Sequence, residues 1–201
     1  MANITKTNVS NIKPSTNVTR PIITNMKAMT TSPRIKVADD TTKHLDQRVA
    51  VFVDVQNMYY SGKNLFNRKL NFGMLLKKAV NNRKLIRALA YVIKADMPEE
   101  QNFRDALKNI GFEVRSKDLQ TFYGGNKKGD WDVGIAMDTI RISPKVDTIV
   151  LVSGDGDFAD LVTYLKGLGC RIEVIGFEQT TSSKLLDVAD DFIPLDRKYM
   201  I

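Results

Sequence analysis

Two uninterrupted apolar runs, each ending in carboxylates, constrain the fold of this chain more than any other feature. They are Val49–Asp54 (VAVFVD) and Ile149–Asp157 (IVLVSGDGD). Apolar runs rich in β-branched residues and without alternation are typical of strands that are buried on both faces of a parallel sheet. Because the carboxyl ends of parallel strands open at one edge of the sheet, where ligands bind in α/β proteins, we expect these carboxylates to meet there.

A third acidic segment, Asp130–Asp132 (DWD), precedes a stretch with helical periodicity. Carboxylates that gather at one edge repel one another, so they destabilise the fold unless they take up protons or bind a cation. A divalent metal ion is the simplest explanation for such a cluster.

Strand and helix patterns alternate from residue 48 onwards, which predicts βαβ units with a parallel sheet and right-handed crossovers. The first strand, 49–54, and the fourth, 148–153, are expected to be neighbours. The other expected strands are 85–93, 112–115, 171–176 and 192–195. The expected helices are 72–81, one that begins at Pro98 and ends before Gly111, 132–142, 157–168 and 182–189, with a loop over 116–129.

Residues 1–45 are rich in Thr, Asn, Ser and Lys and contain three prolines, so we interpret them as a disordered tail. The first 38 residues carry six basic side chains and no acidic one, and therefore hold most of the net charge of +7. An organellar transit peptide is an alternative interpretation of this composition. Residues 46–201 then form a single domain.

Composition excludes several kinds of site. Cys170 is the only cysteine and His44 the only histidine, so a disulfide framework, a thiolate or imidazole zinc site and a Ser-His-Asp triad are excluded. A single cysteine favours a reducing compartment, and we expect the cytoplasm. No apolar run reaches the roughly 20 residues that cross a bilayer, so no membrane association is expected.

Basic residues are concentrated in one further segment. Residues 55–95 hold nine Lys and Arg and no carboxylate. This segregation suits a polyanion that is bound by its backbone and presented to the acidic cluster. A solvated basic helix face is the alternative.

Three segments together resemble the NYN domain, a branch of the PIN-like nuclease superfamily, and in particular its LabA-like group. They are VFVDVQNMYY at 51–60, KKGDWDVGIAMD at 127–138 and LVSGDGDFADLV at 151–162. The family's D-x-x-N is matched by Asp54 and Asn57, and its S-G-D-x-D-F by 153–158. Its K-G-x-D-V is matched by Lys128, Gly129, Asp132 and Val133, with one additional residue between the glycine and the aspartate. The resemblance covers about 47–195.

The resemblance implies an α/β/α sandwich with a central, mainly parallel sheet and a metal-dependent endoribonuclease centre that uses Mg²⁺ or Mn²⁺. Both ions prefer oxygen ligands, which agrees with the carboxylates. The implied metal ligands are Asp54, Asp132 and Asp155, and Asp157 joins them as a catalytic residue. Single-stranded RNA is the expected partner, and its implied binding residues are Asn57, Lys127, Lys128, Ser153 and Gly154.

Each of these residues also has a structural interpretation. Asp132 and Asp157 could cap helices, and Asn57 could close a turn after the first strand. Ser153 and Gly154 could simply form a tight turn. Aromatic residues near the acidic segments could stack on bases or belong to the core: Tyr59, Tyr60, Phe122, Tyr123 and Trp131.

Two other functions remain open. A non-catalytic NYN protein could bind RNA or a protein partner and regulate it. A phosphatase is a weaker alternative, because Gln56 stands where the second acidic residue of such a site is required. The pattern leaves the oligomeric state open, a homodimer included.

Overall fold

The computed structural model describes residues 45–94, 98–118, 120–121, 127–128 and 130–201, all within one compact unit. For Lys94, 98–100, 120–121 and 127–128 it describes the backbone alone. Residues 1–44 of the expected tail lie outside the described residues, as do Phe122 and Tyr123.

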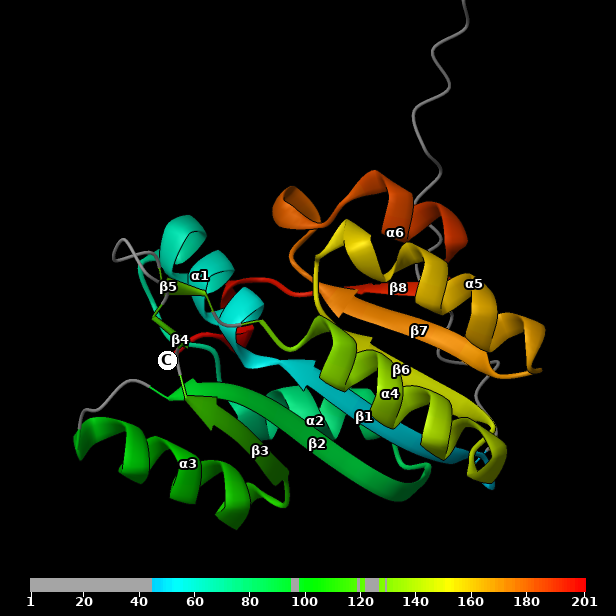
Figure 1. The fold of residues 1–201 in the computed structure, drawn as a ribbon, viewed down its shortest axis with the longest axis horizontal. Coiled ribbons are helices and arrows are strands. Elements are labelled where there is room, and N and C mark those ends of the chain that lie inside the picture. Colours follow the sequence, from blue (N-terminus) through cyan, green and yellow to red (C-terminus); the bar gives the residue numbers. More distant parts are fainter. Residues whose placement is uncertain (1–44, 95–97, 119, 122–126, 129) are drawn as a thin grey trace, which may run out of the picture. The chain divides into compact units, whose positions relative to one another are not determined.

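A six-stranded sheet in the order β3-β2-β1-β6-β7-β8 forms the centre of the fold, and every pairing within it is parallel (Figure 1). The strands are β1 Arg48–Asp54, β2 Lys84–Lys94, β3 Glu113–Asp118, β6 Thr148–Val152, β7 Arg171–Gly176 and β8 Asp191–Pro194. The expected neighbours, β1 and β6, pair directly, with Val51 opposite Val150. The parallel sheet is therefore confirmed.

Helices cover both faces of the sheet. The helices are α1 Val55–Phe66, α2 Phe72–Val80, α3 Pro98–Ile110, α4 Asp132–Ile142, α5 Ala159–Gly167 and α6 Ser183–Val188. Buried residues of α1, α2 and α3 pack into one hydrophobic cluster, and those of α4, α5 and α6 pack into another on the opposite face. The expected α/β/α sandwich is thus confirmed, and Figure 1 shows its two helical layers.

The first strand shows why its sequence has no alternation. Val49, Val51 and Val53 belong to the first cluster, whereas Ala50 and Phe52 belong to the second. All five side chains are fully buried. Burial of apolar surface stabilises a fold by about 25 cal/mol per Å². Because β1 buries apolar side chains on both faces, it stabilises the packing of both helical layers.

Helix α1 was not expected from the sequence. Its apolar positions Val55, Met58 and Leu65 follow helical spacing, and Asp54 caps its first turn by accepting a hydrogen bond from the Asn57 backbone. Ser61 and Gly62 in its middle weaken the helical propensity, although both are buried. The capping carboxylate was the signal that could have revealed it.

Two boundaries also differ from expectation. The expected loop 116–129 contains structure, because β3 continues to Asp118 and a short antiparallel pair joins β4 Gln120–Thr121 to β5 Lys127–Lys128. The helix expected from Asp157 begins with a 3-10 turn, Gly156–Phe158, before α5.

The basic segment 55–95 is not purely a surface feature. The Arg83 guanidinium is buried and forms two hydrogen bonds of 2.8 Å to the Glu173 carboxylate in β7. Arg87 pairs with Glu113 on β3. At least these two cations therefore stabilise the fold, and they are not available to a polyanion. Across the part of the chain that the structure describes, no helix is both long enough and apolar enough to cross a bilayer.

Candidate metal centre

Asp54 ends β1 at the carboxyl edge of the sheet. Its Oδ1 accepts a hydrogen bond from the Asn57 backbone N–H at 3.0 Å, so the carboxylate is held at the amino end of α1. The positive end of the helix dipole favours a negative charge at this position. The Asp54 side chain is nevertheless partly buried.

Asp155 and Asp157 lie in the turn that follows β6, the neighbour of β1. Asp155 accepts a hydrogen bond of 2.9 Å from the Asp157 backbone N–H and so caps the 3-10 turn. Asp157 makes no capping bond, and Phe158 occupies the N-cap position of α5 without a side-chain bond. The interpretation of Asp157 as a helix cap is therefore wrong, and the side-chain cap in this segment is that of Asp155 on the 3-10 turn.

Asp132 is the first residue of α4. Trp131 stands at the N-cap, and no side-chain hydrogen bond caps this helix. The capping interpretation of Asp132 is therefore also wrong. Figure 1 shows the amino end of α4 beside the ends of β1 and β6.

These positions bring three carboxylates together. One oxygen atom from each of Asp132, Asp155 and Asp157 lies within 4.8 Å of the other two. Ligands on opposite sides of a Mg²⁺ ion, each at about 2.1 Å, are about 4.2 Å apart, so small side-chain rotations suffice for all three to reach one ion. An all-oxygen donor set fits Mg²⁺ or Mn²⁺.

Asp54 lies beside this cluster, and the negative charges of the cluster affect its pKa. Burial raises the pKa of Asp54 to about 6, and the carboxylates of Asp132 and Asp155 contribute to the rise, whereas the Asn57 backbone N–H opposes it. Burial also raises the pKa of Asp132, together with repulsion from Asp130, Asp155 and Asp157. Burial is the largest cause of both shifts, and repulsion between the gathered carboxylates adds to it.

Asn57 connects the two strand ends. Its backbone donates to Asp54, and its side-chain Oδ1 accepts a hydrogen bond of 3.0 Å from the Gly154 backbone N–H. The amide therefore ties α1 to the turn after β6. It is not simply the closure of a local turn, because its partner lies 97 residues away in the sequence.

Ser153 and Gly154 are accounted for by contacts within the protein. Ser153 is buried, and its Oγ accepts a hydrogen bond from the Asp155 backbone N–H at 3.2 Å. A Cβ on Gly154 would lie 2.8 Å from the Thr180 carbonyl oxygen. The Gly154 carbonyl also accepts a hydrogen bond from the Ser182 backbone N–H. Both residues thus shape the turn that carries Asp155 and Asp157.

The model of the NYN domain family matches residues 48–196 of the chain. This match contains all four carboxylates and Asn57. The chain belongs to the NYN domain family. The family is a branch of the PIN-like superfamily, whose members are typically nucleases.

Relatives of this NYN domain include both curated proteins and solved structures. The chain is 30% identical to the low amplitude and bright protein LabA of Synechococcus elongatus, over 74% of the chain and 84% of that protein. It is 33% identical to the uncharacterized protein MJ0482 of Methanocaldococcus jannaschii, over 48% of the chain and 37% of that protein. The crystal structure of a protein of unknown function, VPA0982 from Vibrio parahaemolyticus, superimposes with a TM-score of 0.74 at 35% identity, and the match covers 79% of this chain and 99% of that one.

The other residues of this NYN domain that the sequence suggested for RNA binding are two lysines and several aromatic residues. The side chains of Lys127 and Lys128 lie outside the described residues. Tyr59 and Tyr60 are exposed on α1, with their rings edge to face. Trp131 is half-buried against Tyr91, and its Nε1 donates to the Val92 carbonyl at 3.0 Å, so it is part of the packing.

Proposed function

We propose that this NYN domain is a metal-dependent endoribonuclease that hydrolyses single-stranded RNA. The observation that carries the proposal is the convergence of three carboxylate oxygens within 4.8 Å, beside a fourth carboxylate whose pKa burial raises to about 6. Membership of a superfamily that consists typically of nucleases supports the reaction class.

Asp132, Asp155 and Asp157 would hold a Mg²⁺ or Mn²⁺ ion, and Asp54 adds a fourth carboxylate to the same centre. When bound, such an ion lowers the pKa of water and neutralises charge that develops on the attacked phosphate. The chain's own residues set the geometry. Asn57 holds the turn after β6 against α1, and the Asp155 capping bond fixes the direction of the carboxylates.

The test uses the full chain with labelled single-stranded RNA, and with DNA of the same sequence, in Mg²⁺, Mn²⁺ or chelator. We expect the RNA to be cleaved only with added metal. Asp132→Asn should reduce cleavage about 100-fold or more, because even outer partners of metal ligands cost 10-fold to 100-fold when removed. Binding of Mn²⁺, followed by calorimetry, should weaken in parallel.

Asp160→Asn is the matched control. Asp160 is an exposed carboxylate in the first turn of α5, three residues beyond Asp157, and is not among the clustered carboxylates. This variant changes the net charge by the same amount and should leave cleavage and Mn²⁺ binding intact. A well-folded wild type that binds RNA but cleaves none under any of these conditions would contradict the nuclease and favour a non-catalytic regulator.

A further inference from the structure

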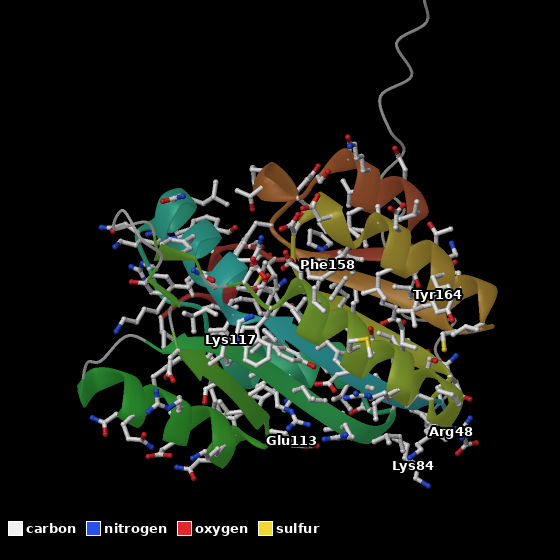
Figure 2. The ribbon with its side chains drawn as sticks, in the orientation of Figure 1. Arg48, Lys84, Glu113, Lys117, Phe158 and Tyr164 are labelled. Carbon is white, nitrogen blue, oxygen red and sulfur yellow. The ribbon has the colours of Figure 1, made fainter. Side chains whose placement is uncertain are left out.

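The edge strand β3 presents charged side chains on the same face of the sheet as α4. Arg115 pairs in register with Tyr91 of β2, and the Tyr91 hydroxyl donates to Asp138 of α4 at 3.0 Å. Lys117, two residues further along β3, points to the same side by the period of a strand. Figure 2 shows Lys117 near the amino end of α4. We call Lys117, Arg115 and Arg141 the basic strip.

The two arginines of the strip are only loosely paired. Arg115 Nε lies 3.7 Å and Arg141 Nη1 lies 3.5 Å from oxygens of one carboxylate, that of Asp138, and their side chains are 47% and 69% exposed. The buried pair of Arg83 and Glu173, with two bonds of 2.8 Å, shows how a structural arginine is held in this fold. Because a guanidinium has five N–H donors, most donors of Arg115 and Arg141 remain available to an anion.

Lys117 links the strip to the acidic centre. Its Nζ lies 4.8 Å from the ring centroid of Trp131, the residue that precedes Asp132. Its positive charge opposes the rise in the pKa of Asp132. Among the residues that the structure describes, no carboxylate lies within ion-pair distance of Lys117. An ammonium group with no acidic partner among the described residues therefore lies near Asp132, one of the proposed metal ligands.

We propose that the basic strip binds the sugar–phosphate backbone of single-stranded RNA, and that Lys117 contacts the phosphate next to the one that is hydrolysed. This inference rests on the proposed function, and it adds the path by which the substrate reaches the metal centre. The geometry supports a backbone contact, because Lys117 and Arg115 are about 7 Å apart along an extended strand and their charges have the sign that phosphates require.

The experiment measures binding of a labelled single-stranded RNA to the full chain in chelator, so that cleavage cannot interfere, over a range of salt concentrations. Lys117→Ala should weaken binding several-fold and reduce the slope of log K against log salt by about 0.7, the value for one phosphate contact on a single strand. Arg115→Gln combined with Arg141→Gln should reduce the slope by about twice as much. Lys117→Arg should restore wild-type binding, because it restores the charge.

Lys84→Ala provides the matched control. Lys84 belongs to the basic segment 55–95, but it is exposed at the beginning of β2, at the amino end of that strand, and Figure 2 shows it at the end of the sheet away from Lys117. Lys84→Ala removes the same charge as Lys117→Ala, and its RNA binding should remain that of the wild type. Equal losses in Lys84→Ala and Lys117→Ala would overturn the proposal, since net charge alone would then explain both.

The alternative is that Lys117 only fixes Trp131 by its cation–π contact. In that case Lys117→Ala would lower the melting temperature without changing the salt slope, and the proposal would be lost. Salt-dependent losses specific to the strip in a protein that cleaves nothing would support the strip and reject the nuclease. Metal-dependent cleavage by the wild type, with no loss of RNA binding in the strip variants, would support the nuclease and reject the strip.

Discussion

Asp54 combines two opposing electrostatic environments. The amino end of α1 and the Asn57 backbone N–H favour its ionised form, whereas burial and two neighbouring carboxylates disfavour it. Burial is the larger effect, so the pKa rises to about 6. A partly buried carboxylate with a raised pKa reduces the stability of the fold near neutral pH. Its presence at this position is therefore consistent with a role in function.

This balance predicts a pH dependence of stability in chelator. The native state holds the Asp54 proton up to a pH of about 6, whereas the unfolded chain releases it near pH 4. Because the native state binds the extra proton between these values, the free energy of unfolding should fall by about 2 kcal/mol as the pH rises from 4 to 7. Urea denaturation at several pH values measures it.

Asp54→Asn is the control for that measurement. The amide cannot ionise, so the variant should lack this part of the pH dependence and be more stable than the wild type at pH 7. Superimposable pH profiles for the two proteins would show that Asp54 ionises in the native state as readily as in the unfolded one.

At the scale of elements, the conformation of the turn after β6 depends on two segments that pack against it. Gly154 and Gly156 allow the segment before α6 to approach closely, because a Cβ on Gly154 would meet the backbone of Thr180 and Thr181 at 2.8 and 3.2 Å. The turn is also held by the Asn57 side chain from α1. Two elements distant in sequence thus position Asp155 and Asp157.

Gly154→Ala should therefore destabilise the protein by about 1–3 kcal/mol, the usual effect of overpacking, and weaken Mn²⁺ binding because the turn must shift. Gly167→Ala is the comparison, since nothing lies within 4 Å of its added Cβ at the end of α5. It should be neutral or stabilise by up to about 1 kcal/mol. Thermal denaturation and calorimetry measure both effects. Wild-type Mn²⁺ affinity in Gly154→Ala would contradict the role of this close contact.

At the scale of the whole molecule, the apolar core and the positive charge lie in different parts of the chain. Both hydrophobic clusters are built from residues between Val49 and Met200. Six of the basic residues lie in the first 38 positions, where the sequence has no acid. Stability and affinity for a polyanion should therefore respond separately to truncation.

Removal of residues 1–40 should leave the melting temperature almost unchanged, because this segment has too little apolar surface to offset its ordering entropy. RNA affinity should fall, and the salt slope should decrease by up to about 4 if all six cations contact phosphates. Salt titrations of the full and truncated chains give the answer. An unchanged slope would show that the segment does not touch the RNA.

Local patterns were sufficient for much of the architecture. The β-branched apolar runs predicted the strands, because strand formation and burial on both faces leave a local pattern. The alternation of strands with helices along the chain then predicted their parallel arrangement. The same runs placed Asp54, Asp155 and Asp157 at strand ends. Helix α1 was missed although its capping signal was local, since Ser61 and Gly62 obscured its periodicity.

The tertiary structure alone determined which side chains meet. The sequence favoured Asp54 with Asp132 and Asp155 as the ligand set, whereas the oxygens within 4.8 Å come from Asp132, Asp155 and Asp157. The contacts of Lys117 with Trp131, and of Asp138 with Tyr91 and the arginines, had no sequence signal. These contacts over a few ångströms are set by strand register, by the crossovers and by burial. All three depend on residues far apart in the chain, so no local sequence pattern encodes them.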